Sequence, residues 1–219
     1  KQPAYGIPVD PHHLFLTAGA SQGLDLACTL YAPAGSTVVV EEPTYFVIEK
    51  IFRDRNLNVV GVPTDSQGMQ VDGLEKLLLD GLKPKLVYII PTFQNPTGFC
   101  LSHDRRTQLI SLANRFDFHI LADEVYQLIY FGELPPKPLI AFDHGNRVIS
   151  FGSFSKILAP GLRTGWIHAA PEIIARFSAA ALTFSGGGFN HYSSALIREV
   201  IYLGLIEDHV SFLREEYSI

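Results

Sequence analysis

Short apolar runs alternate with amphipathic stretches along most of the chain. Seven runs, such as Thr37-Val38-Val39-Val40, are rich in apolar residues and bounded by turn residues, which is typical of buried strands. The stretches between them carry apolar residues at helical spacing, and Ser21 and Ser102 are candidate caps for two of them. The predicted strands cover residues 14–17, 37–41, 59–62, 86–90, 119–123, 147–151 and 164–169. The predicted helices cover residues 21–31, a segment from 46 to about 55, 71–79, 102–116, 171–183, 192–203 and 206–219.

The order of these elements predicts an α/β fold. Short strands that are mostly separated by helices indicate a largely parallel sheet covered on both faces. We therefore expect three αβα layers around a mostly parallel seven-stranded sheet. In open sheets of this kind, ligands bind beyond the carboxyl ends of the strands, so we expect the functional site at that edge.

Composition narrows the classes of function. The chain has 219 residues, of which 47% are hydrophobic and 18% charged, an ordinary globular composition with room for a large core. A net charge of −5 and the lack of a basic cluster argue against nucleic-acid binding through this segment. Cys28 and Cys100 lack metal-type spacing and are typical of reduced thiols in a cytoplasmic protein, so we predict no metal site and no disulfide. No apolar run is long enough to span a bilayer, and no membrane partner is expected.

Polar or conformationally special residues follow five of the predicted strands. In chain order they are the Gly19-Ala20-Ser21 turn, Tyr45, Asn95, Asp123 and Lys156. Most lysines are solvated, so a surface lysine in a polar loop is the simple alternative for Lys156 taken alone. Five such positions at one sheet edge are hard to ascribe to core packing, and together they favour an active site with a Schiff-base lysine.

The turn and the acid at this edge suggest what the ligand carries. The Gly19-Ala20-Ser21-Gln22 turn leads into a helix, whose free N–H groups and positive dipole end suit a phosphate, although a plain helix cap would look the same. Arg163 is a second candidate for the phosphate, unless it forms only a surface salt bridge. Asp123 ends a buried strand and needs a cation or a strong donor, such as a protonated ring nitrogen.

The remaining candidates complete the same ligand. Asn95 and Tyr126 can donate to a phenolate-type oxygen, although Asn95-Pro96-Thr97-Gly98 is also an ordinary turn sequence. Tyr45 offers a ring for stacking, or for simple packing at a helix start. With Lys156 as the amine for an aldehyde, the assembly predicts a ligand with a phosphate, a ring nitrogen, a ring hydroxyl and an aldehyde. Pyridoxal 5′-phosphate (PLP) has all four.

Five motifs in this order closely resemble the class I/II aminotransferases, PLP enzymes of the aspartate aminotransferase fold (fold type I). The residues of these motifs are most similar to those of the branch with 2-aminoadipate and kynurenine-type aminotransferases, and the resemblance covers nearly the whole chain. The motifs are Ala18-Gly19-Ala20-Ser21-Gln22, Glu42-Pro43-Thr44-Tyr45, Asn95-Pro96-Thr97-Gly98, Ala122-Asp123-Glu124-Val125-Tyr126, and Ser153-Phe154-Ser155-Lys156 followed by Gly161-Leu162-Arg163-Thr164-Gly165-Trp166.

The resemblance implies a role for each candidate. As the catalytic residues, Lys156 would form the Schiff base and shuttle a proton, Asp123 would keep the ring nitrogen protonated, and Tyr126 would bind the ring oxygen. Ala20 departs from the serine or glycine usual at its position, so it could contribute only a backbone N–H. The cofactor-binding residues implied are Ala20, Ser21, Gln22, Tyr45, Asn95, Asp123, Tyr126, Ser153, Ser155, Lys156 and Arg163.

The resemblance also implies an architecture and an activity. Family members are considerably longer, so we expect residues 1–205 to form the PLP-binding large domain and residues 206–219 to begin the helix that leads into an absent small domain. A homodimer that moves an amino group between an L-amino acid and a 2-oxo acid is expected. Two alternatives stay open, a PLP lyase of the same fold and the ligand-sensing domain of a winged-helix transcription regulator. The intact site residues argue against a degenerate pseudoenzyme.

Overall fold

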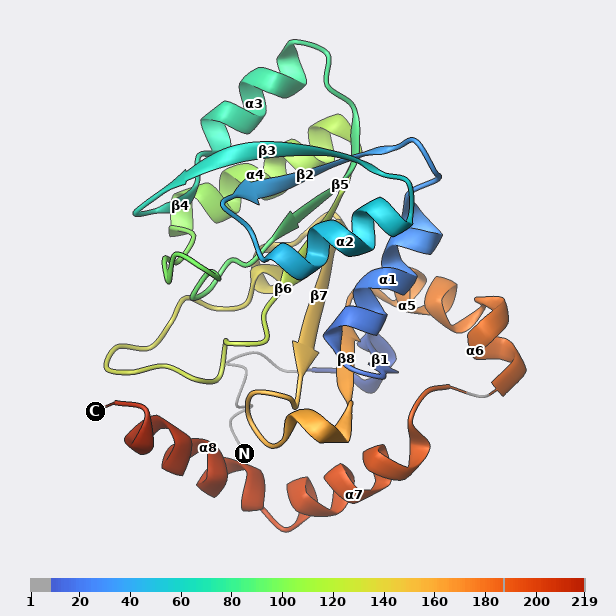
Figure 1. The fold of residues 1–219 in the computed structure, drawn as a ribbon, viewed down its shortest axis with the longest axis vertical. Helices are drawn as coiled ribbons and strands as arrows, with labels where there is room; N and C mark the ends of the chain where they lie inside the picture. Colours follow the sequence, from blue (N-terminus) through green and yellow to red (C-terminus); the bar gives the residue numbers. More distant parts are fainter. Residues whose placement is uncertain (1–8, 187, 219) are drawn as a thin grey trace.

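A computed structural model describes residues 9–186 and 188–218, and its core is one eight-stranded sheet with helices on both faces (Figure 1). The strands are β1 (Leu14–Thr17), β2 (Thr37–Glu42), β3 (Asn58–Asp65), β4 (Gly68–Met69), β5 (Pro84–Ile89), β6 (His119–Asp123), β7 (Val148–Ser153) and β8 (Gly165–His168). The helices are α1 (Ala20–Tyr31), α2 (Phe46–Asp54), α3 (Val71–Leu79), α4 (His103–Phe116), α5 (Pro171–Ser178), α6 (Ala181–Gly186), α7 (His191–Tyr202) and α8 (Leu205–Glu216), with short 3-10 helices at Pro11–His13, Leu139–Phe142 and Pro160–Leu162.

The sheet has the order β1-β8-β7-β6-β5-β2-β3-β4. The five central strands, β7, β6, β5, β2 and β3, pair in parallel, while β8 runs antiparallel to both of its neighbours and β4 antiparallel to β3. The predicted three-layer α/β fold is therefore confirmed, and all seven predicted strands are present. The eighth strand, β4, was not predicted, because two residues carry no periodic signal.

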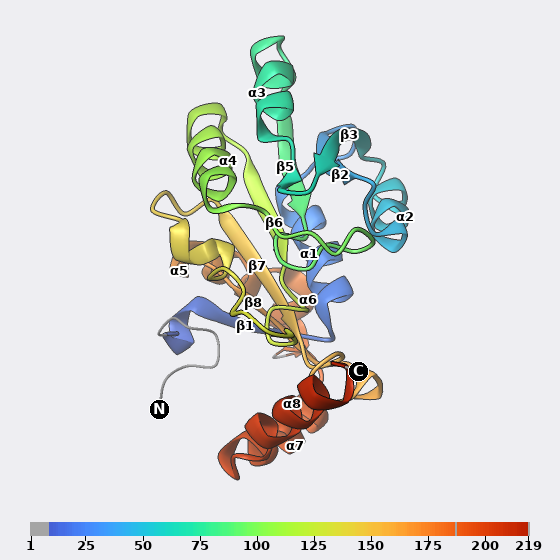
Figure 2. The same ribbon diagram turned by 90° about the vertical axis from the view of Figure 1, so that its left-hand side faces the viewer.

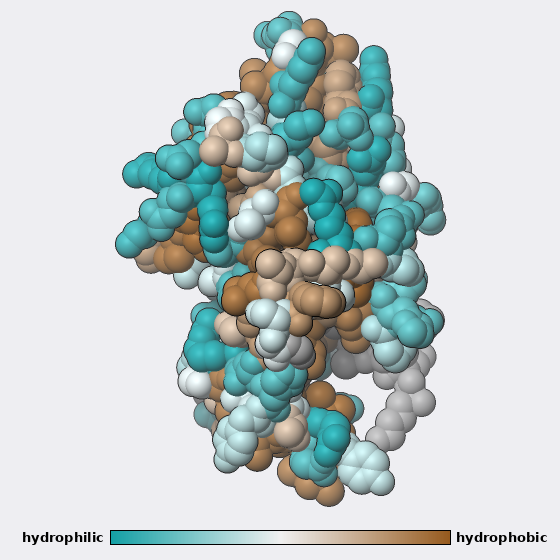
Figure 3. Space-filling model, turned by 90° about the vertical axis from the view of Figure 1, so that its right-hand side faces the viewer, coloured by the Kyte–Doolittle hydropathy of each residue, from teal (hydrophilic) through white to brown (hydrophobic). Residues whose placement is uncertain are grey.

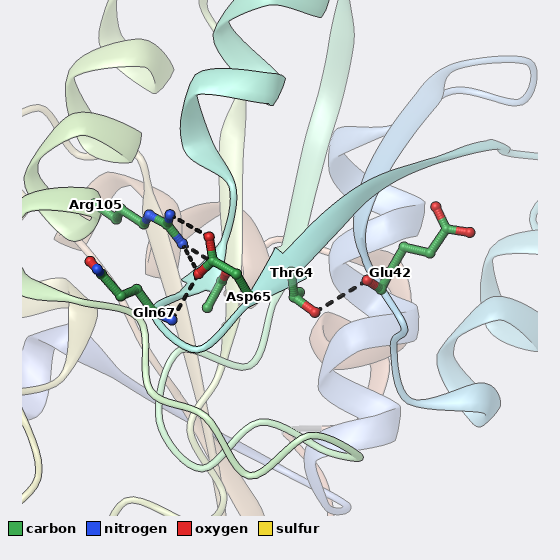
Figure 4. Close-up of polar contacts among 6 residues, drawn as sticks. Glu42, Thr64, Asp65, Gln67 and Arg105 are labelled. Carbon is green, nitrogen blue, oxygen red and sulfur yellow. Dashed lines mark hydrogen bonds and ion pairs between the residues drawn. The ribbon is translucent and has the colours of Figure 1, made fainter.

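The hairpin of β3 and β4 is fixed from outside by α4. The guanidinium of Arg105 forms a two-pronged ion pair with Asp65, with N···O distances of 2.6 and 2.7 Å, and donates to the carbonyl of Gly68 at 2.9 Å (Figure 4). On the opposite side, the hydroxyl of Thr64 donates to the carbonyl of Glu42 at 3.2 Å and joins β3 to the end of β2. Side-chain contacts therefore hold a strand that is too short to be stable by its ladder alone.

Alternation along the strands builds two separate cores, one on each face of the sheet. Val38 and Val40 point to one face, where the sheet packs on buried residues of α1, α2 and α5. Val39 lies between them and points to the other face, where the sheet packs on α3 and α4. Both cores are completely buried at their centres, as expected for a parallel sheet between two helix layers.

The start of α1 and the segment after β8 depart from the predicted elements. Gly19, not Ser21, stands at the cap position of α1, and Ser102 precedes α4 without a side-chain cap hydrogen bond. The helix predicted for residues 171–183 is divided into α5 and α6. The division follows burial: α5 turns its apolar face into the core, whereas Leu182 and Phe184 of α6 are exposed, so nothing holds the two on one axis.

Helices α7 and α8 lie beyond the end of β7, apart from the two main helix layers (Figures 1 and 2). Apolar residues reach the surface where α6 and α7 run, in the middle and lower parts of the face drawn in Figure 3. An apolar groove of about 560 Å³ lies between α7 and the region of Leu16 and Phe154. The exposed large apolar residues of α6, α7, α8 and the turn between α7 and α8 are Leu182, Phe184, Tyr192, Leu196, Ile201, Tyr202, Leu203, Leu205 and Phe212.

Arg214 attaches α8 to the segment that follows β6. Its Nε and Nη2 atoms donate to the carbonyl of Leu128 at 3.1 and 2.8 Å. The guanidinium carbon also lies 3.8 Å from the centre of the Tyr130 ring, which is cation–π geometry. Helix α8 is thereby fastened to the segment that carries Tyr126.

In the part of the chain that the structure describes, no helix is both long and apolar enough to cross a bilayer.

Candidate active site

A cavity of about 260 Å³ opens at the carboxyl ends of the parallel strands. Ile90, Val125 and Pro160, which were not predicted, complete its wall. Gln22 does not line the cavity, because its Oε1 atom turns back to accept a hydrogen bond from the backbone N–H of Ala18 at 3.1 Å. Ten of the eleven predicted cofactor residues do line it, namely Ala20, Ser21, Tyr45, Asn95, Asp123, Tyr126, Ser153, Ser155, Lys156 and Arg163.

Asp123 is the buried acid of the cavity. As the last residue of β6 it is 6% exposed, and its Oδ2 atom accepts a hydrogen bond from the hydroxyl of Tyr88 at 2.9 Å. Its Oδ1 atom is buried without a hydrogen-bond partner among the described residues. Burial raises the pKa of Asp123 to about 6, against the lowering effects of the Tyr88 hydrogen bond, the nearby backbone N–H of Val125 and the charge of Lys156. The carboxyl is therefore mainly an anion at neutral pH, with one oxygen available to a cationic donor.

Lys156 lies in the turn directly after β7, and its side chain is exposed at the mouth of the cavity. Its Nζ atom lies 5.7 Å from the centre of the Tyr126 ring. Because Lys156 also lowers the pKa of Asp123 through its charge, the amine and the acid act on each other across the cavity. The amine is accessible to an incoming aldehyde.

Asn95 and Tyr126 meet on another wall of the cavity. The Nδ2 atom of Asn95 lies 3.5 Å from the hydroxyl of Tyr126, so both can turn to a shared acceptor. Asn95 precedes a cis peptide bond to Pro96. The neighbouring Gln94 is buried, and its Nε2 donates to the carbonyl of Pro43 at 2.8 Å, which joins the Asn95 loop to the loop of Tyr45.

The start of α1 and the guanidinium of Arg163 form the cationic end of the cavity. Gly19 has a φ of 91°, and a Cβ atom there would lie 2.6 Å from Nη2 of Arg163. Glycine therefore lets the guanidinium approach the free N–H groups of the first helical turn. The Nη1 atom of Arg163 donates to the hydroxyl of Ser155 at 3.3 Å, and the hydroxyl of Ser153 accepts from the backbone N–H of Ser155 at 3.1 Å. The backbone N–H groups, the guanidinium and the Ser155 hydroxyl together suit an anion.

Tyr45 lines the cavity, and Asn190 supports one of its loops from behind. Tyr45 stands just before α2, and its ring lines the cavity while its edge meets Phe46 at 5.3 Å between ring centres. Asn190 stands at the N-cap position of α7, and its Nδ2 atom donates to the carbonyls of Leu162 and Arg163 at 2.8 and 2.5 Å. It holds the Arg163 loop from behind and does not line the cavity.

Two buried side chains behind the cavity were missed by sequence reasoning. Tyr88 sits in the apolar run of β5 and reads as core, yet its hydroxyl binds Asp123. Glu41 is 1% exposed, and its Oε2 accepts from the N–H of Ile90 at 2.9 Å. Strand parity is the signal that could have found Tyr88, because it pairs with Leu121, two residues before Asp123 and on the same face.

The sheet and this cavity define an α/β protein with a lysine-centred site at the carboxyl edge of its strands. Comparison with known proteins makes the class specific: the chain belongs to the aminotransferase class I and II family, whose model matches residues 2–209. The resemblance found in the sequence motifs is confirmed. Within the described ranges, no cluster of three or more His, Cys, Asp or Glu side chains is arranged to hold a metal ion.

Relatives of two kinds match most of the chain. It is 39% identical over 219 residues to aromatic-amino-acid aminotransferase 1 of Thermococcus litoralis, covering 98% of this chain and 52% of that protein. It is 31% identical to the HTH-type transcriptional regulator YisV of Bacillus subtilis, over 96% of this chain and 43% of that protein. The crystal structure of Pyrococcus horikoshii kynurenine aminotransferase superposes with a TM-score of 0.87 at 35% identity, covering 92% of this chain and 51% of that one. The chain spans about half the length of the curated relatives it matches.

Proposed function

We propose that this chain is the cofactor-binding part of a PLP-dependent aminotransferase that moves an amino group between an L-amino acid and a 2-oxo acid. The observation that carries the proposal is the unpaired Oδ1 of Asp123 in the same cavity as the accessible amine of Lys156. A buried carboxylate with one oxygen that accepts no hydrogen bond is stabilised by a further donor, and a protonated pyridine nitrogen is a cationic one. The amine supplies the second contact that PLP needs.

The other walls fit the remaining groups of PLP. The N–H groups of Ala20 and Ser21, with Arg163 and Ser155, suit its phosphate, because all of them offer donors or positive charge. Asn95 and Tyr126 suit the ring hydroxyl oxygen, and Tyr45 offers its ring as a stacking surface. The structure of the Pyrococcus relative was solved with PMP, which supports the same cofactor class here. The side chain of Gln22 would not contact PLP, because it is bonded to the backbone N–H of Ala18.

The chain's residues divide the chemistry between them. When bound, PLP supplies an aldehyde and an electron-withdrawing ring. Asp123 keeps a proton on the ring nitrogen, since its ionised carboxylate stabilises the cation in a buried place. Lys156 would hold the cofactor through its amine, and that amine would also be the base for the proton on the substrate Cα. Tyr126 and Asn95 hold the ring oxygen and fix the plane of the ring.

Trapping the cofactor on the protein tests the proposal. We expect borohydride reduction after incubation with PLP to fix the cofactor to the peptide that contains Lys156, as read by mass spectrometry. Lys156→Ala is expected to abolish the fixed label, whereas Lys76→Ala, which removes an exposed lysine of α3, is expected to keep it. A label of equal yield on Lys156→Ala would overturn the assignment of the amine.

The regulator relative supports a second candidate, a ligand-sensing domain, because the same residues would hold PLP there. A panel of amino acids with 2-oxo acids, given to the full-length protein, separates the possibilities. An aminotransferase is expected to form a new amino acid in an amount equal to the oxo acid released. A lyase would release ammonia, and a sensor would bind PLP and the amino acid without turnover.

The proposal extends to assembly and location. Many apolar side chains of α6, α7 and α8 are exposed, which supports a homodimer. Both cysteines are free thiols, which supports a cytoplasmic location. Light scattering on the eluting protein tests the dimer, and a mass equal to one chain at micromolar concentration would contradict it.

A further inference from the structure

We infer that Tyr88 is a positioning residue for Asp123: its hydroxyl occupies Oδ2 and leaves Oδ1 as the acceptor for the ring nitrogen of the cofactor. This inference rests on the proposed function, because it assigns a role within the same site. Tyr88 touches neither substrate nor cofactor, and it acts only through the carboxyl group.

The sheet brings the two side chains together. Strands β5 and β6 are adjacent and parallel, Tyr88 pairs with Leu121, and Asp123 follows two residues later on the same face. The phenol is completely buried, and its ring meets Phe52 of α2 edge-on, with 5.9 Å between ring centres and 74° between ring planes. Packed from one side by Phe52, the ring presents its hydroxyl to Oδ2 of Asp123 at 2.9 Å. A carboxyl group so held cannot rotate to exchange its oxygens without losing that bond.

The phenol can act only as a donor at this place. Burial and the nearby carboxylates of Asp123 and Glu41 raise the pKa of Tyr88 well above its usual value, so it keeps its proton. Its hydrogen bond stabilises the ionised form of Asp123, whose pKa burial has raised to about 6. Loss of the donor should raise that pKa further, towards neutral pH. A protonated Asp123 would offer a hydrogen rather than accept one from the ring nitrogen.

The charged and titratable groups around this pair come from several elements. Lys156 after β7 lowers the pKa of Asp123, and the adjacent Glu124 and Asp123 repel each other. Glu41 of β2 and Tyr45 before α2 act on the phenol. All of these remain in a Tyr88→Phe variant, which deletes one oxygen and keeps the ring that fills the core. A difference between this variant and the wild type therefore reports on the hydroxyl.

The direct test follows the titration of Asp123 without cofactor. In protein labelled with ¹³C at aspartate carboxyls, the signal of Asp123, assigned by its loss in Asp123→Asn, is followed from about pH 5 to about pH 9. We expect the midpoint in Tyr88→Phe to rise by about one pH unit. 3-Fluorotyrosine incorporated at position 88, a stronger donor of nearly the same volume, is expected to move the midpoint the other way. An Asp123 midpoint that is the same in all three proteins would overturn the inference.

A second readout is the pH dependence of PLP affinity, measured by equilibrium dialysis. Tyr88→Phe is expected to bind PLP about tenfold more weakly near pH 5, where the one-unit rise of the Asp123 pKa has its full effect, and only about twofold more weakly at neutral pH, with the difference vanishing at higher pH. Tyr31→Phe is the control, because it also removes one phenol oxygen, here from a half-buried tyrosine beside His119 at the opposite end of β6. An affinity loss in Tyr88→Phe that is equal at all pH values would show a packing role instead.

The two readouts separate failure of the inference from failure of the proposed function. If the wild type binds no PLP at any pH, the proposed function is wrong, while the titration of Asp123 still decides what Tyr88 does. If the wild type binds PLP and Tyr88→Phe keeps the wild-type pH profile, the proposed function stands and the role of Tyr88 is wrong.

Discussion

Replacing Gly19 by alanine should damage both the cationic end of the cavity and the stability of the fold. Gly19 has a φ of 91° and a ψ of 166°, a backbone conformation open to glycine and little else. A Cβ atom there would lie 2.6 Å from Nη2 and 3.2 Å from Cζ of Arg163. The guanidinium must then move away from the start of α1, or the turn must change shape.

The two consequences are similar in free energy but appear in different measurements. An alanine held at this backbone conformation costs about 1–3 kcal/mol of the free energy of unfolding, which lowers Tm by roughly 2–12 °C in a chain of this size. Displacing Arg163 removes a charge-assisted contact with an anion, worth about 1.5–3 kcal/mol, so the affinity for PLP should fall about tenfold to a hundredfold.

The assay pairs urea unfolding with equilibrium dialysis of PLP, and Gly35→Ala is the matched control. Gly35 also has a positive φ, 85°, but a Cβ atom there would meet nothing within 4 Å. We expect Gly35→Ala to lose stability and keep its affinity for PLP, whereas Gly19→Ala loses both. If Gly19→Ala bound PLP as tightly as Gly35→Ala, the close approach of Arg163 would not be what makes the anion site.

Two predictions concern buried groups behind the site. Arg106 is fully buried and donates to the carbonyls of Pro91, Leu101 and Lys137, so Arg106→Met should lower the free energy of unfolding by about 3 kcal/mol or more, because these acceptors lose their donors. Urea unfolding measures this loss of free energy. Arg105→Met, which removes the partly exposed ion pair with Asp65, is the control and should lose about 1 kcal/mol. Equal losses of unfolding free energy in the two variants would contradict the argument. Burial raises the pKa of Glu41 to about 8, so the folded state holds this proton more tightly than the unfolded state, and stability should fall as pH rises from the ordinary carboxyl pKa through about 8. Glu41→Gln should remove that fall, and parallel pH profiles of stability for the two proteins would refute it.

Much of the fold could be predicted from the sequence because apolar runs and their periods report burial directly. The runs at Val38–Val40 and Ile120–Ala122 are such cases, and both lie at the centre of the sheet. The division of α5 from α6 at two alanines could not be predicted, since alanine favours helix and only tertiary burial decides where the axis turns. The two-residue strand β4 could not be predicted because it has no hydrophobic pattern of its own and is held by side-chain contacts of Arg105.

The site shows the same division between local and tertiary signals. Lys156 and Asp123 were predicted because their place after a strand can be read from the chain itself. The nearness of Gly19 to Arg163 joins positions far apart in sequence, and only the folded structure brings their atoms together. Tyr88 was missed because a tyrosine in an apolar strand carries the same pattern whether its hydroxyl is idle or bound to an acid.

The contacts of Arg214 have a mechanical consequence. Helix α8 cannot be displaced from the segment after β6 unless two hydrogen bonds to Leu128 break and the guanidinium leaves the ring of Tyr130. Through these contacts, α8 is joined to the backbone two residues after Tyr126, which lines the cavity. A displacement of α8 would therefore also displace the segment that carries Tyr126, and with it one wall of the candidate active site.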